Sequence, residues 1–276
     1  MPASRSPSRD IKRPPPARRR PLILLGLIGL VGLVGLIVLS AVVILALPAS
    51  LAARFMPPRV HAEDFSGNLL HGAAGKISIN ARDAGAIEWR LHPLSLLRLE
   101  IVADIHWVKV GFLIDGTAEI GPGRFAAHDI RGGGPIDNLQ TLGFASGWNG
   151  TASLAFTAIK GTFAKLEAAE GKIDVANMSS AGIADGSDLG SYELQLGPQS
   201  IDPDGSISAT LNDKGGPVEA QAQIRFSPAT RTGMLSGTLK ERAEASPALR
   251  GQLNNLSQLR PRDAAGRFPV ELEFTF

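Results

Sequence analysis

The stretch GAIEWRLHPLSLLRLEIVADI, Gly85 to Ile105, decides the fold class of this chain. In its first half Ile87, Trp89 and Leu91 alternate with polar residues, which is the period of a strand with one buried face. The second half repeats the alternation, and its apolar set is Leu99, Ile101, Ala103, Ile105 and Trp107. Pro93 lacks a backbone donor and ends the first strand. The sequence therefore predicts two strands joined by a corner.

The corner between these strands is rich in leucine. Leu94, Leu96 and Leu97 follow the proline, and we expect them to pack together in a buried corner. After Trp107 the alternation slips by one position, which indicates a bulge or a tight turn near Gly111. The inward-facing residues after the slip are then Val108, Val110, Phe112 and Ile114.

Short alternating segments continue along the chain and predict further strands. These segments cover residues 77–81, 116–120, 125–130, 152–159, 172–177, 192–196, 206–211, 218–226 and 268–276. Residues 82–85 are expected to turn the chain, and GPGR at residues 121–124 is expected to form a hairpin turn. NDKGG at residues 212–216 is the strongest hairpin signal, because asparagine and glycine accept the positive φ that a reversal needs.

Two segments after residue 50 indicate helices. Ser246 is a good N-cap and Pro247 suits a first turn. The leucines that follow, Leu249, Leu253 and Leu256, have the spacing of one helix face. Residues 135–142 indicate a shorter turn that carries Ile136, Leu139 and Leu142.

The most apolar segment lies near the start of the chain. No charged side chain occurs between Arg20 and Arg54, and residues 22–47 would form a helix of about 39 Å. That length crosses a bilayer core of roughly 30 Å. Ser50 and Ala52 offer a cleavage spacing, but signal-peptide cores run only about 7 to 15 residues. We therefore predict an uncleaved signal anchor over residues 21–47.

The charges before this segment predict its orientation. Residues 1–20 hold seven of the 28 Lys+Arg of the chain and one of its 26 Asp+Glu, so residues 21–276 carry a net charge of about −4. Positive charge is retained in the cytoplasm, and beside an anchor it sets topology rather than binding nucleic acid. We expect a disordered cytoplasmic tail over 1–20, a connector over 48–62 and a periplasmic β-rich domain over 63–276.

Cysteine and catalytic motifs are absent from the sequence. The chain of 276 residues has no cysteine, which excludes disulfides, thiolate nucleophiles and cysteine zinc sites. It has no G-x-S-x-G, no H-E-x-x-H and no phosphate-binding loop. We therefore predict no catalytic, cofactor-binding or metal site and no enzymatic activity.

Three groups of residues could bind a metal or a ligand, but a purely structural role explains each group better. His92, His106 and His128 lie on expected polar faces and would bind zinc only if sheet pairing brought them together. Aspartates in glycine-containing loops suit turn stabilisation better than calcium binding, and they are Asp185, Asp188, Asp202, Asp204 and Asp213. Trp89, Trp107 and Trp148 could form a ligand platform, but two of them lie on the apolar face and should be core.

The order of a signal anchor, a proline connector and EWRLHPLSLL, residues 88–97, resembles the N component of the type II secretion system, the general secretion pathway protein N family. DFSGNLLHGAA, residues 64–74, is similar to the family element G-T-x-W-x-G-x-A, with Asn68 and Leu70 in place of Thr and Trp. Other similar segments are DIRGGGPIDNL, AEGKIDV, LNDKGGPVEAQAQIRF and MLSGTLKERAEASPALRGQLNNL.

This resemblance implies a fold and a role. The fold is mainly β, with a single amino-terminal transmembrane helix, a curved antiparallel sheet and one or two short helices. The role is that of a non-enzymatic inner-membrane accessory of protein secretion. It acts by periplasmic contact with the inner-membrane platform or the outer-membrane channel, and it meets membrane lipid through the anchor.

Two other functions stay open at this point. Periplasmic proteins of the AsmA-like type join an anchor to an open sheet with an apolar trough, and they transport lipids or act in envelope homeostasis. The apolar face that carries Ile87, Trp89, Leu99 and Ile101 discriminates between a secretion accessory and a lipid transporter. We expect this face to be sealed in a secretion accessory and open in a lipid transporter. An envelope enzyme would need a histidine cluster.

Overall fold

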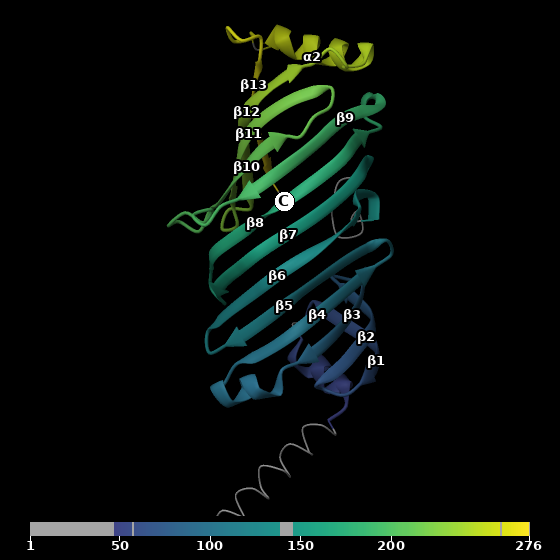
Figure 1. Ribbon diagram of the computed structural model, residues 1–276, viewed down its shortest axis with the longest axis vertical. Coiled ribbons are helices and arrows are strands. Elements are labelled where there is room, and N and C mark those ends of the chain that lie inside the picture. Colours follow the sequence, from purple (N-terminus) through teal and green to yellow (C-terminus); the bar gives the residue numbers. More distant parts are fainter. Residues whose placement is uncertain (1–46, 57, 139–145, 260, 276) are drawn as a thin grey trace, which may run out of the picture. The chain divides into compact units, whose positions relative to one another are not determined.

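One antiparallel sheet contains all the strands that the structure describes. The structure is a computed structural model and describes residues 47–56, 58–138, 146–259 and 261–275. Its 13 strands lie in the order of the sequence, from β1 to β13, so each strand pairs with its neighbours along the chain (Figure 1). The predicted antiparallel, mainly β fold is confirmed.

The elements have the following bounds. The strands are β1 Val60–Gly67, β2 His71–Ile79, β3 Arg82–Leu91, β4 Ile101–Lys109, β5 Phe112–Gly121, β6 Arg124–Pro135, β7 Trp148–Thr162, β8 Leu166–Ser180, β9 Ile183–Leu196, β10 Ile207–Asp213, β11 Val218–Ser227, β12 Thr232–Glu241 and β13 Phe268–Thr275. The helices are the 3-10 helices η1 Ala49–Phe55 and η2 Pro93–Arg98 and the α-helix α2 Pro247–Leu259.

The predicted anchor over residues 21–47 lies outside the described residues, apart from Leu47. In the part of the chain that the structure describes, no helix is both long enough and apolar enough to cross a membrane. The segment expected as a connector, residues 48–62, contains η1 and the start of β1. Ala49 in η1 is buried, and contacts join η1 to β1.

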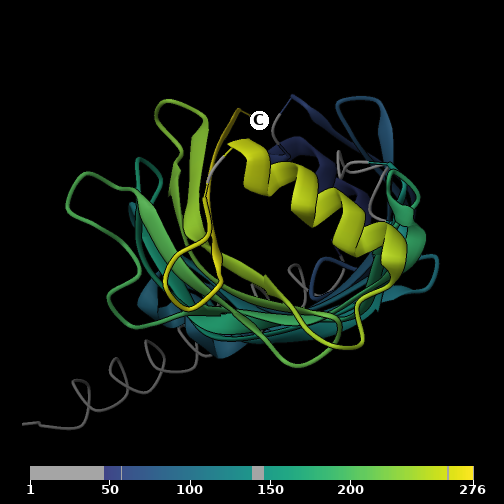
Figure 2. The same ribbon diagram turned by 90° about the horizontal axis from the view of Figure 1, so that it is seen from above.

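The sheet is strongly curved, and α2 lies across its open side (Figure 2). The predicted helix is therefore confirmed, and so is its cap. Ser246 Oγ accepts a hydrogen bond from the backbone N–H of Leu249 at 3.2 Å. Leu249 and Leu253 are buried against Leu189, Val218 and Phe268. Of the shorter predicted turn, Ile136 is buried, and residues 139–145 lie outside the described part.

The opening stretch forms β3, η2 and β4, as predicted, but its leucines are not packed. Leu94, Leu96 and Leu97 are all exposed, and no residue of η2 is buried. The helix projects past the ends of β3 and β4, and β4 is the element that it contacts appreciably among those described. The prediction that these leucines pack together in a buried corner is therefore wrong.

Leu99 also departs from the prediction. It caps η2 in the left-handed conformation, with φ 57°, and its side chain is exposed instead of starting the inward face of β4. We refer to Leu94, Leu96, Leu97 and Leu99 together as the leucine corner.

The tight turn near Gly111 is confirmed, but two of the residues expected to face inward do not. Lys109 pairs with Phe112, so Val110 lies in the turn itself and is exposed. Val108 pairs with Leu113 on the outer face, and both are exposed. No slip of the alternation is therefore needed before the turn.

The turn between β2 and β3 lies earlier than predicted. Asn80 and Ala81 make it, both with positive φ, and residues 82–85 already belong to β3. The hairpin at residues 212–216 is confirmed, because β10 and β11 pair on either side of it. GPGR likewise joins β5 to β6, whose residues Gly121 and Arg124 pair directly.

Candidate functional site

A continuous apolar stripe crosses the concave face of the sheet. Residues directly opposite each other on neighbouring strands carry their side chains on the same face. One such row runs through every strand and consists of Phe65, Ala74, Ile87, Trp107, Ile114, Gly132, Leu154, Ile173, Leu194, Leu211, Ala222, Gly237 and Val270. At about 4.8 Å between strands, this row extends over nearly 60 Å.

The neighbouring row on the outer face is mostly polar. It consists of Ser66, Ala73, Glu88, His106, Asp115, Arg131, Ala155, Lys172, Gln195, Thr210, Gln223, Ser236 and Glu271. The sheet therefore separates an apolar concave face from a polar outer face, which is the arrangement that the alternation predicts.

An apolar cavity of about 620 Å³ lies between α2 and the concave face. Leu249 and Leu253 of α2 line one side. Opposite them the floor is built from small residues, Ala220, Ala222 and Gly237, which leave room that larger side chains would fill. Pockets of roughly 300–1,000 Å³ are the usual size of sites for small molecules.

Tyr192 supplies a polar atom beside this cavity, and that atom is already paired. Its Oη donates a hydrogen bond to the backbone oxygen of Leu189 at 2.6 Å. Burial raises the pKa of Tyr192 to about 12, because a phenolate would lose its hydration there. The phenol is therefore neutral at physiological pH, and the cavity has little charge to offer a polar ligand.

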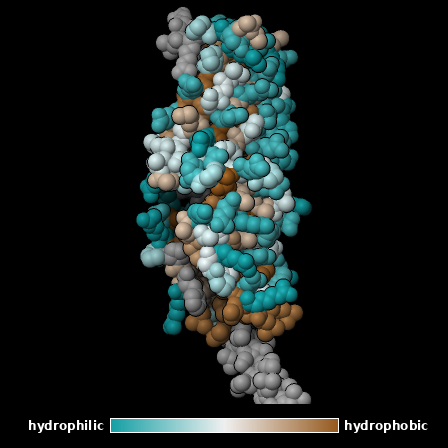
Figure 3. Space-filling view, turned by 90° about the vertical axis from the view of Figure 1, so that its left-hand side faces the viewer, coloured by the Kyte–Doolittle hydropathy of each residue, from teal (hydrophilic) through white to brown (hydrophobic). Residues whose placement is uncertain are grey.

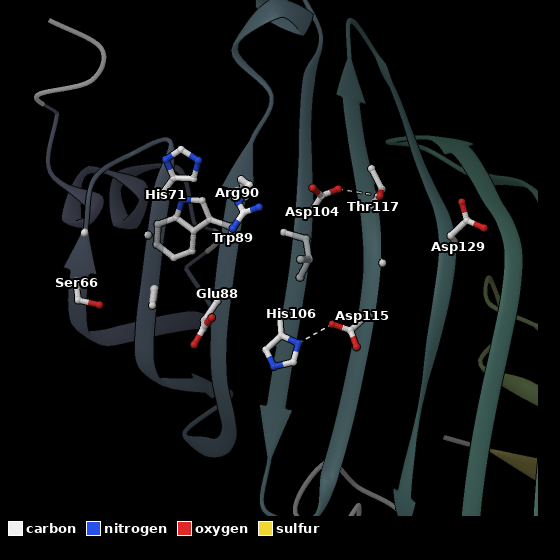
Figure 4. Close-up of a pocket in the computed structure, with 15 residues that line it drawn as sticks. Ser66, His71, Glu88, Trp89, Arg90, Asp104, His106, Asp115, Thr117 and Asp129 are labelled. Carbon is white, nitrogen blue, oxygen red and sulfur yellow. Dashed lines mark hydrogen bonds and ion pairs between the residues drawn. The ribbon is translucent and has the colours of Figure 1, made fainter. Parts of the chain in front are cut away.

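A second cavity, of about 600 Å³, lies among charged residues of β3, β4 and β5 (Figure 4). Asp104 Oδ2 pairs with His92 Nε2 at 2.8 Å, and Asp104 Oδ1 accepts a hydrogen bond from Thr117 at 3.0 Å. The His92 hydrogen bond is the largest influence that lowers the pKa of Asp104. His106 pairs with Asp115 at 2.5 Å. Its partner is thus a carboxylate and not a hydroxyl that a general base would activate.

The three histidines considered for zinc binding are separated by this pairing. His92 contacts Asp104, His106 contacts Asp115, and His128 lies 3.7 Å from a carboxylate oxygen of Glu119. Within the described ranges, no group of three or more metal-ligating side chains could hold an ion.

Three of the five aspartates expected in loops lie in strands instead: Asp185 and Asp188 in β9, and Asp213 in β10. Local hydrogen bonds to backbone N–H groups are nevertheless made by three of the five. Each of three carboxylates accepts a hydrogen bond from the backbone N–H two residues later: Asp188 from Gly190, Asp204 from Ser206 and Asp213 from Gly215. The Ser206 hydrogen bond lowers the pKa of Asp204. The Asp185 side chain lies outside the described part of the structure. Trp148 lines the cavity below α2, whereas Trp89 and Trp107 donate their indole N–H groups to Leu69 and Ala84.

The residues around the α2 cavity were not predicted as a site. Alternation in the sequence indicates which residues of one strand share a face, but not that Trp148, Leu189 and Leu253 meet around one space. The detectable signal was the leucine spacing of the helix, which requires an apolar surface to cover.

The two outermost strands of the sheet differ. β1 carries an irregularity at Asp64, which has φ 56° and has no partner between the pairs formed by Glu63 and Phe65. β13 pairs with β12 without interruption from Phe268 to Thr275, and its other edge is unpaired within the described sheet. A regular open edge can accept another strand. The register of β1 with β2 is the same on both sides of Asp64, so this position interrupts the pairing without adding a residue.

These features define a class of protein: an open, curved antiparallel sheet with one apolar face. The family model for type II secretion system (T2SS), protein N, matches residues 58–271. The chain therefore belongs to the protein N family of the type II secretion system. A search of the curated proteins and a search of the solved structures each found no match.

Proposed function

We propose that this chain is a non-enzymatic, inner-membrane-anchored accessory component of the type II secretion system, and that it acts by protein–protein contact in the periplasm. Family membership supports a role in this secretion system. The apolar length of residues 22–47 and the basic residues before it support an anchor with its amino end in the cytoplasm.

The observation that carries the contact mechanism is the outer edge of β13, along which no second strand pairs among the described residues. Eight consecutive residues, Phe268–Thr275, keep regular register with β12. Pro269 has no backbone N–H, so an added strand would find backbone donors and acceptors along the part of β13 that follows it, residues 270–275. We therefore place the contact with another secretion component along β13, because the backbone pairing of β1 is interrupted at Asp64.

Cross-linking tests this assignment, and the absence of native cysteine makes the labelling specific. A photoactivatable cross-linker is placed on Glu273→Cys in β13, with Gln223→Cys on the outer face of β11 as the matched control. In membranes that contain the assembled secretion system, we expect Glu273→Cys to capture a secretion subunit and Gln223→Cys to capture none. Equal capture at both sites, or no secretion subunit at either, would contradict the proposal.

A second candidate function is binding of a lipid or another hydrophobic ligand, as in AsmA-like transport. The apolar cavity below α2 favours it, because its size suits a ligand and its lining suits hydrocarbon. The same cavity limits the idea, since α2 crosses the open side of the sheet there (Figure 2).

Native mass spectrometry of the full chain, extracted from membranes, tests the second function. Ala222→Phe places a ring in the cavity, whereas Gln223→Phe places the same ring on the outer face. Bound lipid that is lost in Ala222→Phe and kept in Gln223→Phe would support ligand binding. A chain without bound lipid before substitution would exclude this second function and leave the contact mechanism intact.

A further inference from the structure

The leucine corner is an exposed apolar patch at the ends of strands β3 and β4. Leu97 is 84% exposed, and Leu94 and Leu99 are each 78% exposed. Figure 3 shows apolar side chains gathered at the lower end of this side of the molecule, below surfaces that are mostly polar. Apolar side chains that cluster on a surface mark a contact with a protein or a membrane more often than they occur without function.

The conformation of the corner does not depend on packing of its leucines. Ser95 Oγ donates a hydrogen bond to the backbone oxygen of His92 at 2.7 Å and accepts one from the N–H of Val102 at 3.2 Å. Leu99 holds a left-handed φ of 57°, which is unfavourable for a residue with a Cβ. Backbone strain of this kind accumulates at functional positions. The backbone thus holds the leucines outward.

The corner lies close to the point where the predicted anchor ends. The backbone oxygen of Leu47 accepts a hydrogen bond from Leu69 at 2.8 Å. The next residue, Leu70, accepts one from Leu91 at 2.7 Å, and Leu91 stands two positions before η2. Because hydrogen-bonded strands are about 4.8 Å apart and each residue adds at most about 3.8 Å, η2 begins within roughly 20 Å of Leu47. A chain that leaves a bilayer at Leu47 would bring η2 to the bilayer surface.

Arg98 adds charge to this apolar patch. It is exposed and lies between Leu97 and Leu99, in the last turn of η2. Leucines with an adjacent cation are the composition of segments that rest at the interface of a membrane, where the cation meets anionic headgroups.

We propose that the leucine corner docks on the leaflet of the bilayer that faces the described domain, with its leucines among the acyl chains and Arg98 at the phosphates. This contact would fix the orientation of the sheet on the membrane beyond what a single anchor can do. The inference rests on the proposed anchor, and it adds a second membrane contact that is separate from that anchor.

The test measures the depth of two labels on the full chain, reconstituted into vesicles of phosphatidylethanolamine and phosphatidylglycerol. An environment-sensitive fluorophore is attached to Leu97→Cys or to Val110→Cys. These positions are matched, since both are 84% exposed, and they lie at opposite ends of β4, about 30 Å apart. Quenching by nitroxide on the lipid chains is compared with quenching by iodide in the water.

We expect the vesicles to carry the chain in flotation, the Leu97 label to be quenched by the lipid nitroxide, and the Val110 label to be quenched by iodide. If the chain floats and both labels respond to iodide alone, docking is wrong and the anchor stands. If the Leu97 label is shielded from both quenchers, a protein covers the corner and the proposal is overturned. A chain that does not float would overturn the anchor, and docking with it.

Discussion

Individual leucines of this chain differ in how much they contribute to the free energy of unfolding. Leu249 of α2 is 3% exposed, whereas Leu97 of η2 is 84% exposed. Replacing a buried leucine by alanine costs about 2–5 kcal/mol, because transfer free energy is lost and a cavity is left behind. We expect Leu249→Ala to lower the free energy of unfolding by that amount, and Leu97→Ser to change it by less than about 0.5 kcal/mol. Urea denaturation measures both, and a large loss in Leu97→Ser would mean that the corner packs against the protein.

Tyr192 predicts a loss of stability in alkali. Its pKa is about 12 in the folded chain against 10.0 for the ordinary phenol, so the folded state favours the proton. This contribution is complete below pH 10 and is lost as the pH rises towards 12, by about 2 kcal/mol at pH 12. Lysines titrate in the same range, so Tyr192→Phe is the reference. We expect stability to fall more steeply in the parent chain than in Tyr192→Phe, and parallel pH profiles would contradict the burial of this phenol.

The cap of α2 is an element whose contribution can be isolated. Ser246 Oγ satisfies the N–H of Leu249, one of the donors that the first turn leaves without a helical partner. Ser246→Ala should cost about 1 kcal/mol and Ser246→Gly only a few tenths, because glycine is tolerated at N-caps. Thermal unfolding compares the two variants. Equal losses would show that the hydroxyl does not stabilise the helix.

At the scale of elements, strands were predictable where alternation is strict, and turns were less so. The pairing of β10 with β11 followed from the glycines of the turn, since Gly215 and Gly216 both have positive φ. Asn212, expected in the same turn, belongs to β10 and pairs with Gln221. The turn at Asn80 and Ala81 was missed because alanine rarely adopts the φ of 63° found there. β9 runs from Ile183 to Leu196, but its first half is polar and rich in glycine, so only residues 192–196 had a strand pattern.

The candidate sites were less predictable than the strands, for a physical reason. A buried leucine run and an exposed one have the same composition, and the difference lies in whether another element covers them. The leucines of α2 pack against the concave face. Among the described elements, none covers the leucines of η2, which lie past the ends of β3 and β4. Sequence periodicity shows that a face exists, and only the tertiary structure shows whether it is covered.

At the scale of the whole molecule, apolar packing is divided among separate clusters along the sheet. Trp89 packs with the cluster of Ala74 and Ile77 near one end, and Trp148 packs with the cluster of Leu249 and Phe268 near the other. In sheets whose units contact only their neighbours, stability is a sum of local terms. A loss at one end need not reach the other.

Variants that keep one tryptophan test this independence. With Trp89 or Trp148 as the only fluorophore, we expect Leu249→Ala to lower the urea midpoint that Trp148 reports and to leave the midpoint that Trp89 reports unchanged. Identical shifts at both positions would show that the sheet unfolds as a single cooperative unit.

The strict order of the strands has a consequence for how the chain reaches its structure. Since β2 pairs with β1, β3 with β2, and so on to β13, no strand waits for a partner made later. A polypeptide that emerges amino end first, from a ribosome or a translocation channel, can add each hairpin to a template already in place. Apart from the segment 242–267, which carries α2 between β12 and β13, assembly of this kind closes short loops, and contacts that are local in sequence favour fast folding.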